Sequence, residues 1–340
     1  MDTSRLTQWV HAFPQAKILV VGDFFLDKYL IIDPALDEPS LETGLTAYQV
    51  VGIRCAPGAA GTVTNNLTAL GVGQVIGLGI VGQDGEGYDL KAGLQATGVD
   101  VSNLIETATR FTPTYTKPLI REGQGERQIN RMDIRNRTAT TPALESVIIQ
   151  RLHQLAGQVD AIIALDQVNE ANTGVVTDRV REALAEIGKR RMCNVIYADS
   201  RAHIAKFRNV IIKCNHLEVA RAHTGLESED QNVILGCARE MAQVTERPVC
   251  VTQGAQGQWV VEQDKATLVP AYRVEGAIDV CGAGDATTAG TVAALASGAP
   301  LADAAAIGNI VASITIQQLG TTGTATPQQV CERIHGWQVG

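Results

Sequence analysis

The residues best suited to chemistry lie in one short stretch, Asp279-Val-Cys-Gly-Ala-Gly-Asp285, which runs into a series of alanine and threonine residues. Gly282 and Gly284 allow the backbone to turn sharply, and the small residues beyond them predict a closely packed helix. Bare amides at a helix N-terminus favour a phosphate or a developing negative charge. Asp285 could take a proton from an attacking hydroxyl there, or it could simply complement the helix dipole. These residues alone leave both roles open.

This stretch resembles the D-[TS]-x-G-A-G-D segment of the ribokinase-like, or PfkB, carbohydrate kinases. In that family the last aspartate is the general base, and the Gly-Ala-Gly amides bind the phosphoryl group during transfer. The resemblance therefore implies catalytic roles for Asp285 and for Gly282, Ala283 and Gly284. It extends over roughly residues 17–327 through an ordered set of further motifs.

A buried central strand is predicted over Lys17–Gly22, a short apolar run that ends in glycine. Asp23 and Asp27 follow its carboxyl end, which is where ligands of open α/β sheets bind. Two acids there could hold sugar hydroxyls, although acids in loops are more often solvated. The residues resemble the G-D-x-x-x-D segment of the kinases, which implies contact with the sugar.

A glycine turn that leads into a helix is predicted over residues 57–67. The stretch resembles the family's G-G-x-x-x-N-x-A segment, which implies that Gly58 and Asn66 contact the substrate. Ala59 replaces the second glycine of that segment, and Thr62 replaces its asparagine. Because these changes fall near the acceptor, they concern the identity of the sugar more than the kinase chemistry.

Gly77-Leu-Gly-Ile-Val-Gly82 offers a rival interpretation, because G-x-G-x-x-G is a fingerprint of dinucleotide-binding oxidoreductases. A true fingerprint opens a helix after its first glycines. Here Val75–Val81 stays apolar, as is typical of a strand, and the turn comes only before a helix predicted near residues 86–96. The residues also resemble the V-G-x-D-x-x-G of the PfkB kinases, which favours the kinase interpretation.

Two β-rich stretches, near residues 28–56 and 110–133, lack helical periodicity and are predicted to pair as a small sheet over the sugar site. In relatives such a sheet is a lid that excludes water and often forms the dimer contact. A homodimer through this lid is therefore expected, since pairing also protects an exposed sheet edge.

The second lid stretch carries the patterns P-T-x-T-K and R-x-D, which resemble the branch of the family that acts on heptose 7-phosphate. The resemblance implies that Lys117, Arg131 and Asp133 contact the substrate, opposite the two acids that follow the first strand. Two cations closing over a sugar predict an acceptor that already carries a phosphate, although lid charges often face solvent. The branch's D-Y-G-K-G pattern is absent, because residues 166–170 read D-Q-V-N-E. The acceptor therefore stays open.

From residue 142 onward, apolar strands alternate with helices, which predicts a mostly parallel sheet wrapped by helices. The strands are predicted near 161–165, 195–198 and 210–212, and the helices near 142–157, 171–190 and 302–318. Two further strands are expected around a glycine turn, at residues 249–254 and 257–261.

The nucleotide site is implied by resemblance. The family's N-x-x-E motif implies that Glu218 orders Mg²⁺ through water, with Lys213 and Asn215 near the phosphates; a helix cap with a first-turn acid is the alternative. The implied ATP-binding residues are Asp199, Lys213, Asn215, Glu218, Thr252, Gly254, Gly257 and Asn309. Asp279 and Gly320 match positions by which relatives hold a monovalent cation. Mg²⁺ and K⁺ are therefore the expected metals.

Composition excludes several classes of protein. The 340 residues carry a formal net charge of −8 without a basic run, which argues against a nucleic-acid surface. Seven scattered cysteines with no C-x-x-C pair predict neither a disulfide framework nor a zinc cluster, and they fit a reducing cytoplasm. No apolar run approaches the length of a membrane span, and the first residues lack the core of a signal peptide.

Together these features predict one ribokinase-like kinase domain over residues 1–340, a three-layer α/β/α fold with a mostly parallel central sheet and a small β lid. The expected activity is transfer of the γ-phosphoryl group of ATP to a hydroxyl of a sugar or sugar phosphate, with Asp285 as general base. The alternatives are a heptose 7-phosphate kinase specifically, a nucleoside kinase and a sugar-binding protein without activity.

Overall fold

The computed structural model describes residues 2–123, 125–263, 265–320 and 322–337. Within these residues the main sheet has nine strands in the order β16-β15-β14-β13-β12-β11-β1-β6-β7, and neighbours from β14 to β7 run parallel. Its strands are β1 (Lys17–Gly22), β6 (Gln74–Gly82), β7 (Asp100–Thr107), β11 (Ala161–Asp166), β12 (Val195–Ser200), β13 (Ile211–Asn215), β14 (Val249–Thr252), β15 (Gln258–Glu262) and β16 (Lys265–Val269). The mostly parallel sheet predicted from the sequence is confirmed.

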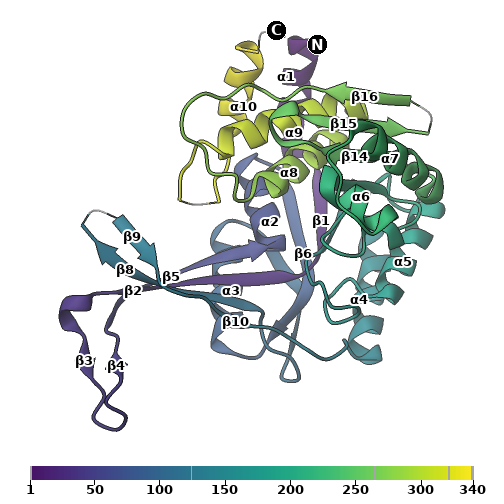
Figure 1. Cartoon of the computed structure of the whole chain (residues 1–340). Coiled ribbons are helices and arrows are strands. Elements are labelled where there is room, and N and C mark those ends of the chain that lie inside the picture. The colour runs from purple at the N-terminus through teal and green to yellow at the C-terminus, as the bar shows by residue number, and fades with distance from the viewer. Residues whose placement is uncertain (1, 124, 264, 321, 338–340) are drawn as a thin grey trace.

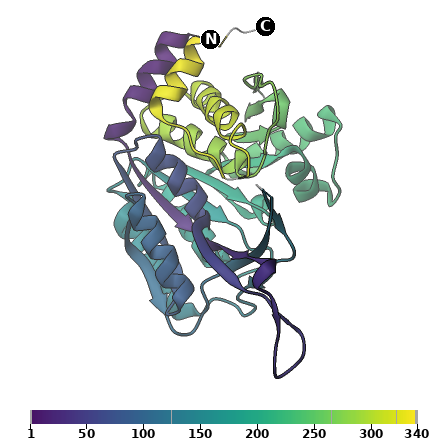
Figure 2. The ribbon, with the colours of Figure 1, turned by 90° about the vertical axis from the view of Figure 1, so that its left-hand side faces the viewer.

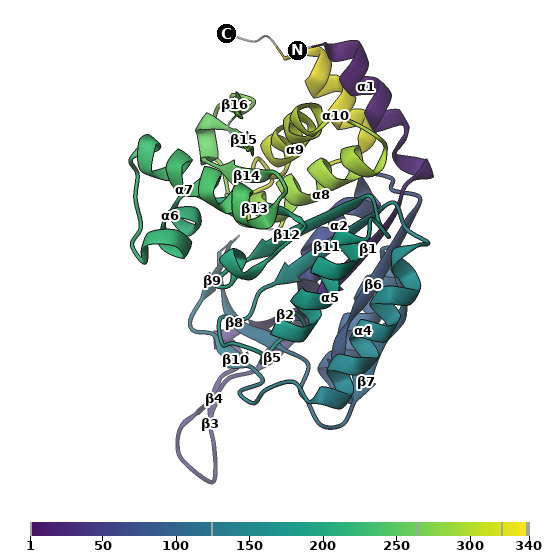
Figure 3. The same ribbon diagram turned by 90° about the vertical axis from the view of Figure 1, so that its right-hand side faces the viewer.

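Helices cover both faces of this sheet. They are α1 (Thr3–His11), α2 (Ala60–Ala69), α3 (Gly85–Ala96), α4 (Pro142–Ala156), α5 (Asp178–Lys189), α6 (His216–Thr224), α7 (Gln231–Thr245), α8 (Ala283–Ala296), α9 (Leu301–Thr315) and α10 (Pro327–His335). Figure 3 shows α4 and α5 along one face, and Figure 2 shows the purple α1 beside the yellow α10.

The central strand β1 explains why the molecule has three layers. Side chains alternate along a strand, and β1 is buried on both faces. Ile18 and Val20 join a hydrophobic cluster with α1, α2, α3, α8, α9 and α10, whereas Leu19 and Val21 join a second cluster with α4 to α7. The predicted three-layer α/β/α fold is thereby confirmed.

The G-x-G-x-x-G stretch lies inside strand β6, and helix α3 begins only at Gly85. Its glycines make room for a neighbouring ring: a Cβ on Gly79 would lie 2.7 Å from Cδ2 of Phe24, and one on Gly77 would lie 3.2 Å from Cζ of Phe24. The glycines therefore allow close packing. The dinucleotide-binding interpretation is wrong, because it requires a helix that begins at these glycines.

A second sheet contains the two β-rich stretches, and we call it the lid. Its path is β10 (Met132–Ile134), β8 (Thr114–Glu122), β2 (Phe24–Ile32) and β5 (Val50–Ala59), and β9 (Gly125–Gln128) pairs with β8. β2 runs parallel to β8 and antiparallel to β5, so the two β-rich stretches pair as predicted. The small hairpin of β3 (Glu38–Pro39) and β4 (Thr46–Ala47) extends away from the body (Figure 1).

One predicted helix begins later than expected. The helix expected over 171–190 starts at Asp178, and residues 167–177 form a loop after β11, which we call the 167–177 loop. Asn172 has a φ of 62°, which interrupts a right-handed helix, and the Thr177 hydroxyl accepts a hydrogen bond from the amide of Val180. The apolar Val175 and Val176 are buried by the loop and not by a longer helix.

Ala59 joins β5 to α2 in a backbone conformation that favours glycine, with φ 54° and ψ −117°. Strain of this kind costs about 1–3 kcal/mol for a residue with a Cβ. Ala59→Gly is therefore expected to raise the free energy of unfolding by about 1 kcal/mol after the entropic cost of glycine, measured by urea denaturation. Ala69→Gly, at a helical position of α2, is the control and should be destabilising. A less stable Ala59→Gly protein would contradict the strain.

No helix in the described part of the chain is both long and apolar enough to span a membrane.

Candidate active site

Asp285 lies in the first turn of α8, whose N-terminus has no side-chain cap. Gly282 precedes the helix with a φ of 77°, and a Cβ there would lie 3.3 Å from Cγ2 of Thr322 and 3.7 Å from Cγ2 of Thr62. The Ala283 amide donates to the Val280 carbonyl oxygen at 3.1 Å, whereas the amides of Gly282 and Gly284 have no hydrogen-bond partner in the described residues. These two amides are left for a ligand, with the positive end of the helix dipole behind them.

The Asp285 carboxyl group is half-buried, and its pKa is raised to about 7 by burial and by the nearby Asp199. The positive charges of Lys213 and Arg201 oppose this rise. A carboxyl group with a pKa near neutrality is suited to accept a proton from a hydroxyl, because its basicity matches the pH at which it works.

A buried ion pair lies next to these amides. Lys213 and Asp199 face each other on β13 and β12, and Nζ of Lys213 lies 2.7 Å from Oδ2 of Asp199. A Cβ on Gly284 would come within 3.0 Å of Nζ of Lys213. Burial alone would lower the pKa of Lys213, but the Asp199 carboxylate outweighs it and keeps the pKa above its ordinary value. A fixed positive charge thus stands beside the anion-binding turn.

Asn215 and Glu218 form a capping box at the start of α6. The Glu218 amide donates to Oδ1 of Asn215, and the Asn215 amide donates to Oε2 of Glu218, both at 2.8 Å. The helix cap that the sequence offered as an alternative is therefore present. Burial raises the pKa of Glu218, and its Oε1 has no hydrogen bond in the described residues.

A pocket of about 600 Å³, which we call the α8 pocket, opens beside this turn. Ala283 and Gly284 line it, and its walls also include residues predicted for ATP, namely Thr252, Gly254, Gly257 and Asn309. Gly257 has a φ of 101°, and a Cβ there would lie 2.2 Å from the Val269 carbonyl oxygen. The volume lies within the usual range for sites of nucleotide-sized ligands.

Asn309 contributes only a wall to the α8 pocket. Its side-chain nitrogen donates to the carbonyl oxygens of Val269 and Pro270, each at 3.0 Å, and its oxygen accepts from Gln258 at 2.9 Å. The amide is thus used to join α9 to β15 and to the segment after β16.

Asp23 has a structural role besides its predicted role as a sugar ligand, which stays a prediction. Its carboxylate is buried and accepts hydrogen bonds from the amides of Val175, at 2.7 Å, and Gln167, at 3.0 Å. Burial and the charge of Asp166 raise the pKa of Asp23 to about 7. Asp23 therefore anchors both ends of the 167–177 loop, and it lines a small cavity of about 70 Å³, the Asp23 cavity.

Gly58 and Asp27 are brought together as predicted, because a Cβ on Gly58 would lie 2.7 Å from Oδ2 of Asp27. Lys117 does not stand opposite Asp27, however. Its Nζ lies 2.6 Å from Oδ1 of Asp27 on the neighbouring strand and 4.9 Å from the centre of the Tyr29 ring. The prediction of opposite walls is wrong, because β2 and β8 pair in parallel and place both residues side by side.

The other lid charges also pair with each other. Arg131, just before β10, forms two hydrogen bonds with Asp133, at 2.7 and 2.9 Å, and stacks over the Tyr115 ring at 4.4 Å. Arg135 adds a third bond to Asp133 at 2.8 Å. The Asp133 carboxylate thus accepts hydrogen bonds from two neighbouring arginines in this structure.

Asn66 lines neither the α8 pocket nor the Asp23 cavity. It is fully buried in the middle of α2, where its side-chain nitrogen donates to the Thr62 carbonyl oxygen at 3.0 Å. In this structure its side chain therefore serves the helix, and its contact with the substrate stays a prediction.

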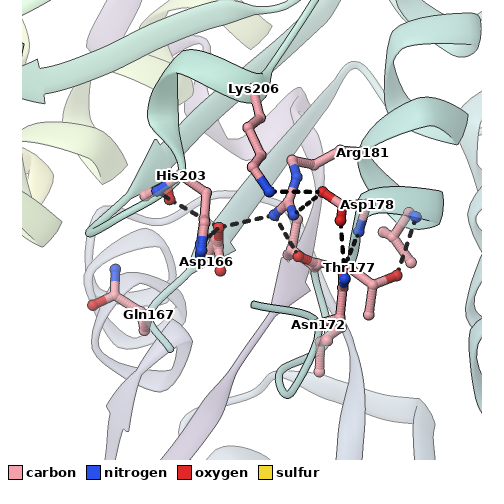
Figure 4. A network of polar contacts seen from close by, with 12 residues as sticks. Asp166, Gln167, Asn172, Thr177, Asp178, Arg181, His203 and Lys206 are labelled. Carbon is pink, nitrogen blue, oxygen red and sulfur yellow. Dashed lines mark hydrogen bonds and ion pairs between the residues drawn. The ribbon is translucent and has the colours of Figure 1, made fainter. Parts of the chain in front are cut away.

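A buried network, not predicted from the sequence, holds the 167–177 loop in place (Figure 4). Oδ2 of Asp166 accepts from Ser200, Arg181 and His203 at 2.8, 3.1 and 3.2 Å. Arg181 also bonds to Asp178 at 2.7 Å. The partners lie up to 37 residues apart, so no local motif indicates the network.

Asp279 and Gly320 meet through a direct hydrogen bond. The Asp279 carboxylate accepts from the Gly320 amide at 3.1 Å and from the Cys281 amide at 3.0 Å. The carboxylate therefore fixes the segment just before the anion-binding turn. In the described residues, no group of three or more His, Cys, Asp and Glu side chains gathers as a metal site.

The chain is similar to sugar kinases in sequence and fold. A family model described as "pfkB family carbohydrate kinase" matches residues 16–329. The bifunctional protein HldE of Citrifermentans bemidjiense is 30% identical over 99% of this chain and 67% of its own length, and that of Trichlorobacter lovleyi is 29% identical over 97% and 65%. The chain therefore spans about two thirds of these relatives.

Solved structures share the fold at low sequence identity. Phosphofructokinase-2 from Escherichia coli has a TM-score of 0.72 at 16% identity, with 94% of this chain and 99% of that chain covered. Ribokinase from Arabidopsis thaliana, complexed with ribose and ATP, has a TM-score of 0.68 at 16% identity, with 94% and 98% covered.

Proposed function

The chain belongs to the pfkB family of carbohydrate kinases, and we propose that it transfers the γ-phosphoryl group of ATP to a hydroxyl of a sugar or sugar phosphate. The observation that carries this proposal is the Asp285 carboxyl group at the uncapped N-terminus of α8, beside a pocket of nucleotide size. Gly284, which lines that pocket, directly precedes Asp285 in the chain. ATP bound in the pocket would therefore lie beside the proposed base.

In this mechanism Asp285 removes the proton from the acceptor hydroxyl as that oxygen attacks the γ-phosphorus. The amides of Gly282 and Gly284 stabilise the negative charge that develops on the phosphoryl oxygens, while the Ala283 amide donates to the Val280 carbonyl oxygen and fixes the turn. Lys213 adds a fixed positive charge behind Gly284, at a position that Asp199 holds. Alignment of the two substrates supplies much of the rate.

The metals belong to the proposal too. Bound Mg²⁺ would neutralise charge on the ATP phosphates, and Oε1 of Glu218 is free to hold a metal-bound water. Asp279 and Gly320 are the candidate K⁺ site, supported by the complex of Escherichia coli phosphofructokinase-2 with potassium. We expect activity that requires Mg²⁺ and rises when K⁺ replaces Na⁺. Equal rates in Na⁺ and K⁺ buffers would count against the K⁺ site. Activity that persists in excess EDTA would count against the requirement for Mg²⁺.

The acceptor is tested by measuring ADP formation over free sugars, sugar phosphates and nucleosides. A heptose 7-phosphate comes first, because Lys117, Arg131 and Asp133 resemble that branch. The Lys117–Asp27 and Arg131–Asp133 pairs bear on this choice, since an incoming phosphate must compete with those carboxylates. A nucleoside as the best acceptor would favour a nucleoside kinase, and no ADP with any acceptor would favour a sugar-binding protein.

We also propose a homodimer through the lid. Large apolar side chains on β5 and the hairpin are exposed, including Leu41 at 104%, Leu45 at 71% and Ile53 at 61%. Surface of this kind marks an interaction site, and pairing would cover it. Sedimentation velocity should give a dimer for the wild-type protein and a monomer for Ile53→Lys. A wild-type monomer at micromolar concentration would contradict this interface.

A further inference from the structure

Arg201 follows β12 directly and lines the Asp23 cavity together with residues of β2, the lid and the 167–177 loop. Its amide donates to the Asp166 carbonyl oxygen at 3.1 Å, which fixes the backbone. Arg201 is exposed, and in the described residues one hydrogen bond holds its side chain, from Nε to Oε1 of Gln167 at 3.0 Å.

The two terminal amino groups of Arg201 have no hydrogen-bond partner in the described residues. This distinguishes Arg201 from the other cations around the site. Arg110 donates to the carbonyl oxygens of Thr138 and Thr173, while Arg135, Lys117 and Lys213 pair with Asp133, Asp27 and Asp199. Each of those charges is already engaged, whereas Arg201 presents two donors outward.

Arg201 is also close enough to the catalytic base to affect it. Its positive charge, like that of Lys213 on β13, lowers the pKa of the Asp285 carboxyl group, against the rise that burial and Asp199 cause. Arg201 thus lines the Asp23 cavity and also lies within electrostatic reach of the base.

The chemistry of the free edge is specific. A planar guanidinium with two free N–H groups matches two oxygens of a phosphoryl group, and such bidentate bonds are stronger than bonds to neutral groups. A hydroxyl offers one acceptor oxygen and no charge, so it uses this edge poorly.

We propose that Arg201, oriented by Gln167, binds phosphoryl oxygens at the junction of the two substrates. This rests on the proposed kinase activity. The oxygens belong either to the γ-phosphoryl group in transfer or to a phosphate that the acceptor already carries. Gln167 departs from the pattern of the heptose 7-phosphate branch, since that branch has tyrosine there.

The test compares Arg201→Gln with wild type on a heptose 7-phosphate and on the corresponding free heptose, or on whichever matched pair the wild-type enzyme uses best. Contact with the γ-phosphoryl group predicts that kcat falls about 100-fold on both acceptors, as for other transition-state donors. Contact with an acceptor phosphate predicts that KM rises for the phosphorylated sugar alone. Arg201→Lys should recover part of the loss, because it restores charge but not the bidentate fork.

Two further variants make the result specific. Gln167→Ala keeps the guanidinium but removes the hydrogen bond that orients it. This variant should change the same kinetic constant as Arg201→Gln, by a smaller factor. Arg190→Gln, at the exposed end of α5 where Arg190 pairs with Glu186, is the matched control and should behave as wild type. Thermal unfolding of each variant separates a folding defect from a kinetic one.

The outcomes distinguish two failures. A wild-type enzyme that forms no ADP with any acceptor overturns the proposed function and this inference with it. An active wild type whose Arg201→Gln variant retains kcat and KM on both acceptors overturns this inference alone. Complete rescue by lysine would contradict bidentate recognition.

Discussion

Asp285→Asn is expected to lower kcat by about 100- to 10,000-fold, the range for loss of a positioned general base. The fold should persist, because asparagine has the same shape and lacks the charge that burial disfavours. The raised pKa of Asp285 means that the carboxylate is less stable in the folded state than in the unfolded state above pH 7. Asp285→Asn should therefore unfold at pH 8 at no lower temperature than wild type.

The pH dependence gives a second test of the same residue. Wild-type kcat/KM should fall as the pH drops through about 7, since protonation removes the base. Burial also raises the pKa of Asp23 to about 7, so the Asp285→Asn variant is needed to show which carboxyl group causes the fall in kcat/KM at low pH. The residual activity of Asp285→Asn should no longer show this fall. Near-wild-type turnover in a folded Asp285→Asn protein would remove Asp285 from the mechanism.

Lys213→Met should affect both stability and catalysis. Removal of one partner of a buried ion pair leaves Asp199 charged and unpaired, which costs about 3–5 kcal/mol. The variant also removes the positive charge beside Gly284 and a charge that favours ionised Asp285. We therefore expect a lower urea midpoint, a lower kcat and an acid limb displaced to higher pH.

The double variant Asp199→Leu/Lys213→Met separates the two effects. Apolar residues of similar volume often replace a buried pair with little loss of stability. The double variant should thus recover most of the stability lost by Lys213→Met, while kcat stays low. Recovery of kcat together with stability would show that the ion pair acts only on the fold.

The sequence predicted the parts of the molecule that local pattern determines. Lys17–Gly22 and Val75–Val81 are apolar runs too short for helices, and both are strands of the central sheet. Glycine and small residues at 282–290 placed the turn and the start of α8 correctly. The start of α5 was missed, because Val175 and Val176 continue an apolar pattern that the loop buries instead.

The side-chain contacts at the site that the sequence did not predict share one physical cause. Asp23 meets Val175 across 152 residues and Lys117 meets Asp27 across 90, so their partners depend on strand order and register. Asparagine is a residue type that often binds ligands, but the side chain of Asn66 is buried in the protein interior. Gln167 and Arg201 likewise lie 34 residues apart and come together only because β11 and β12 are neighbours.

The most direct test of the account is ³¹P NMR of the wild-type protein with ATP, Mg²⁺, K⁺ and each acceptor of a panel of sugars and sugar phosphates, with Asp285→Asn run in parallel. The account predicts a new phosphate ester resonance that grows in step with ADP for the wild type and is nearly absent for the variant. Conversion of ATP to ADP and inorganic phosphate alone, or ester formation at the same rate by Asp285→Asn, would contradict it.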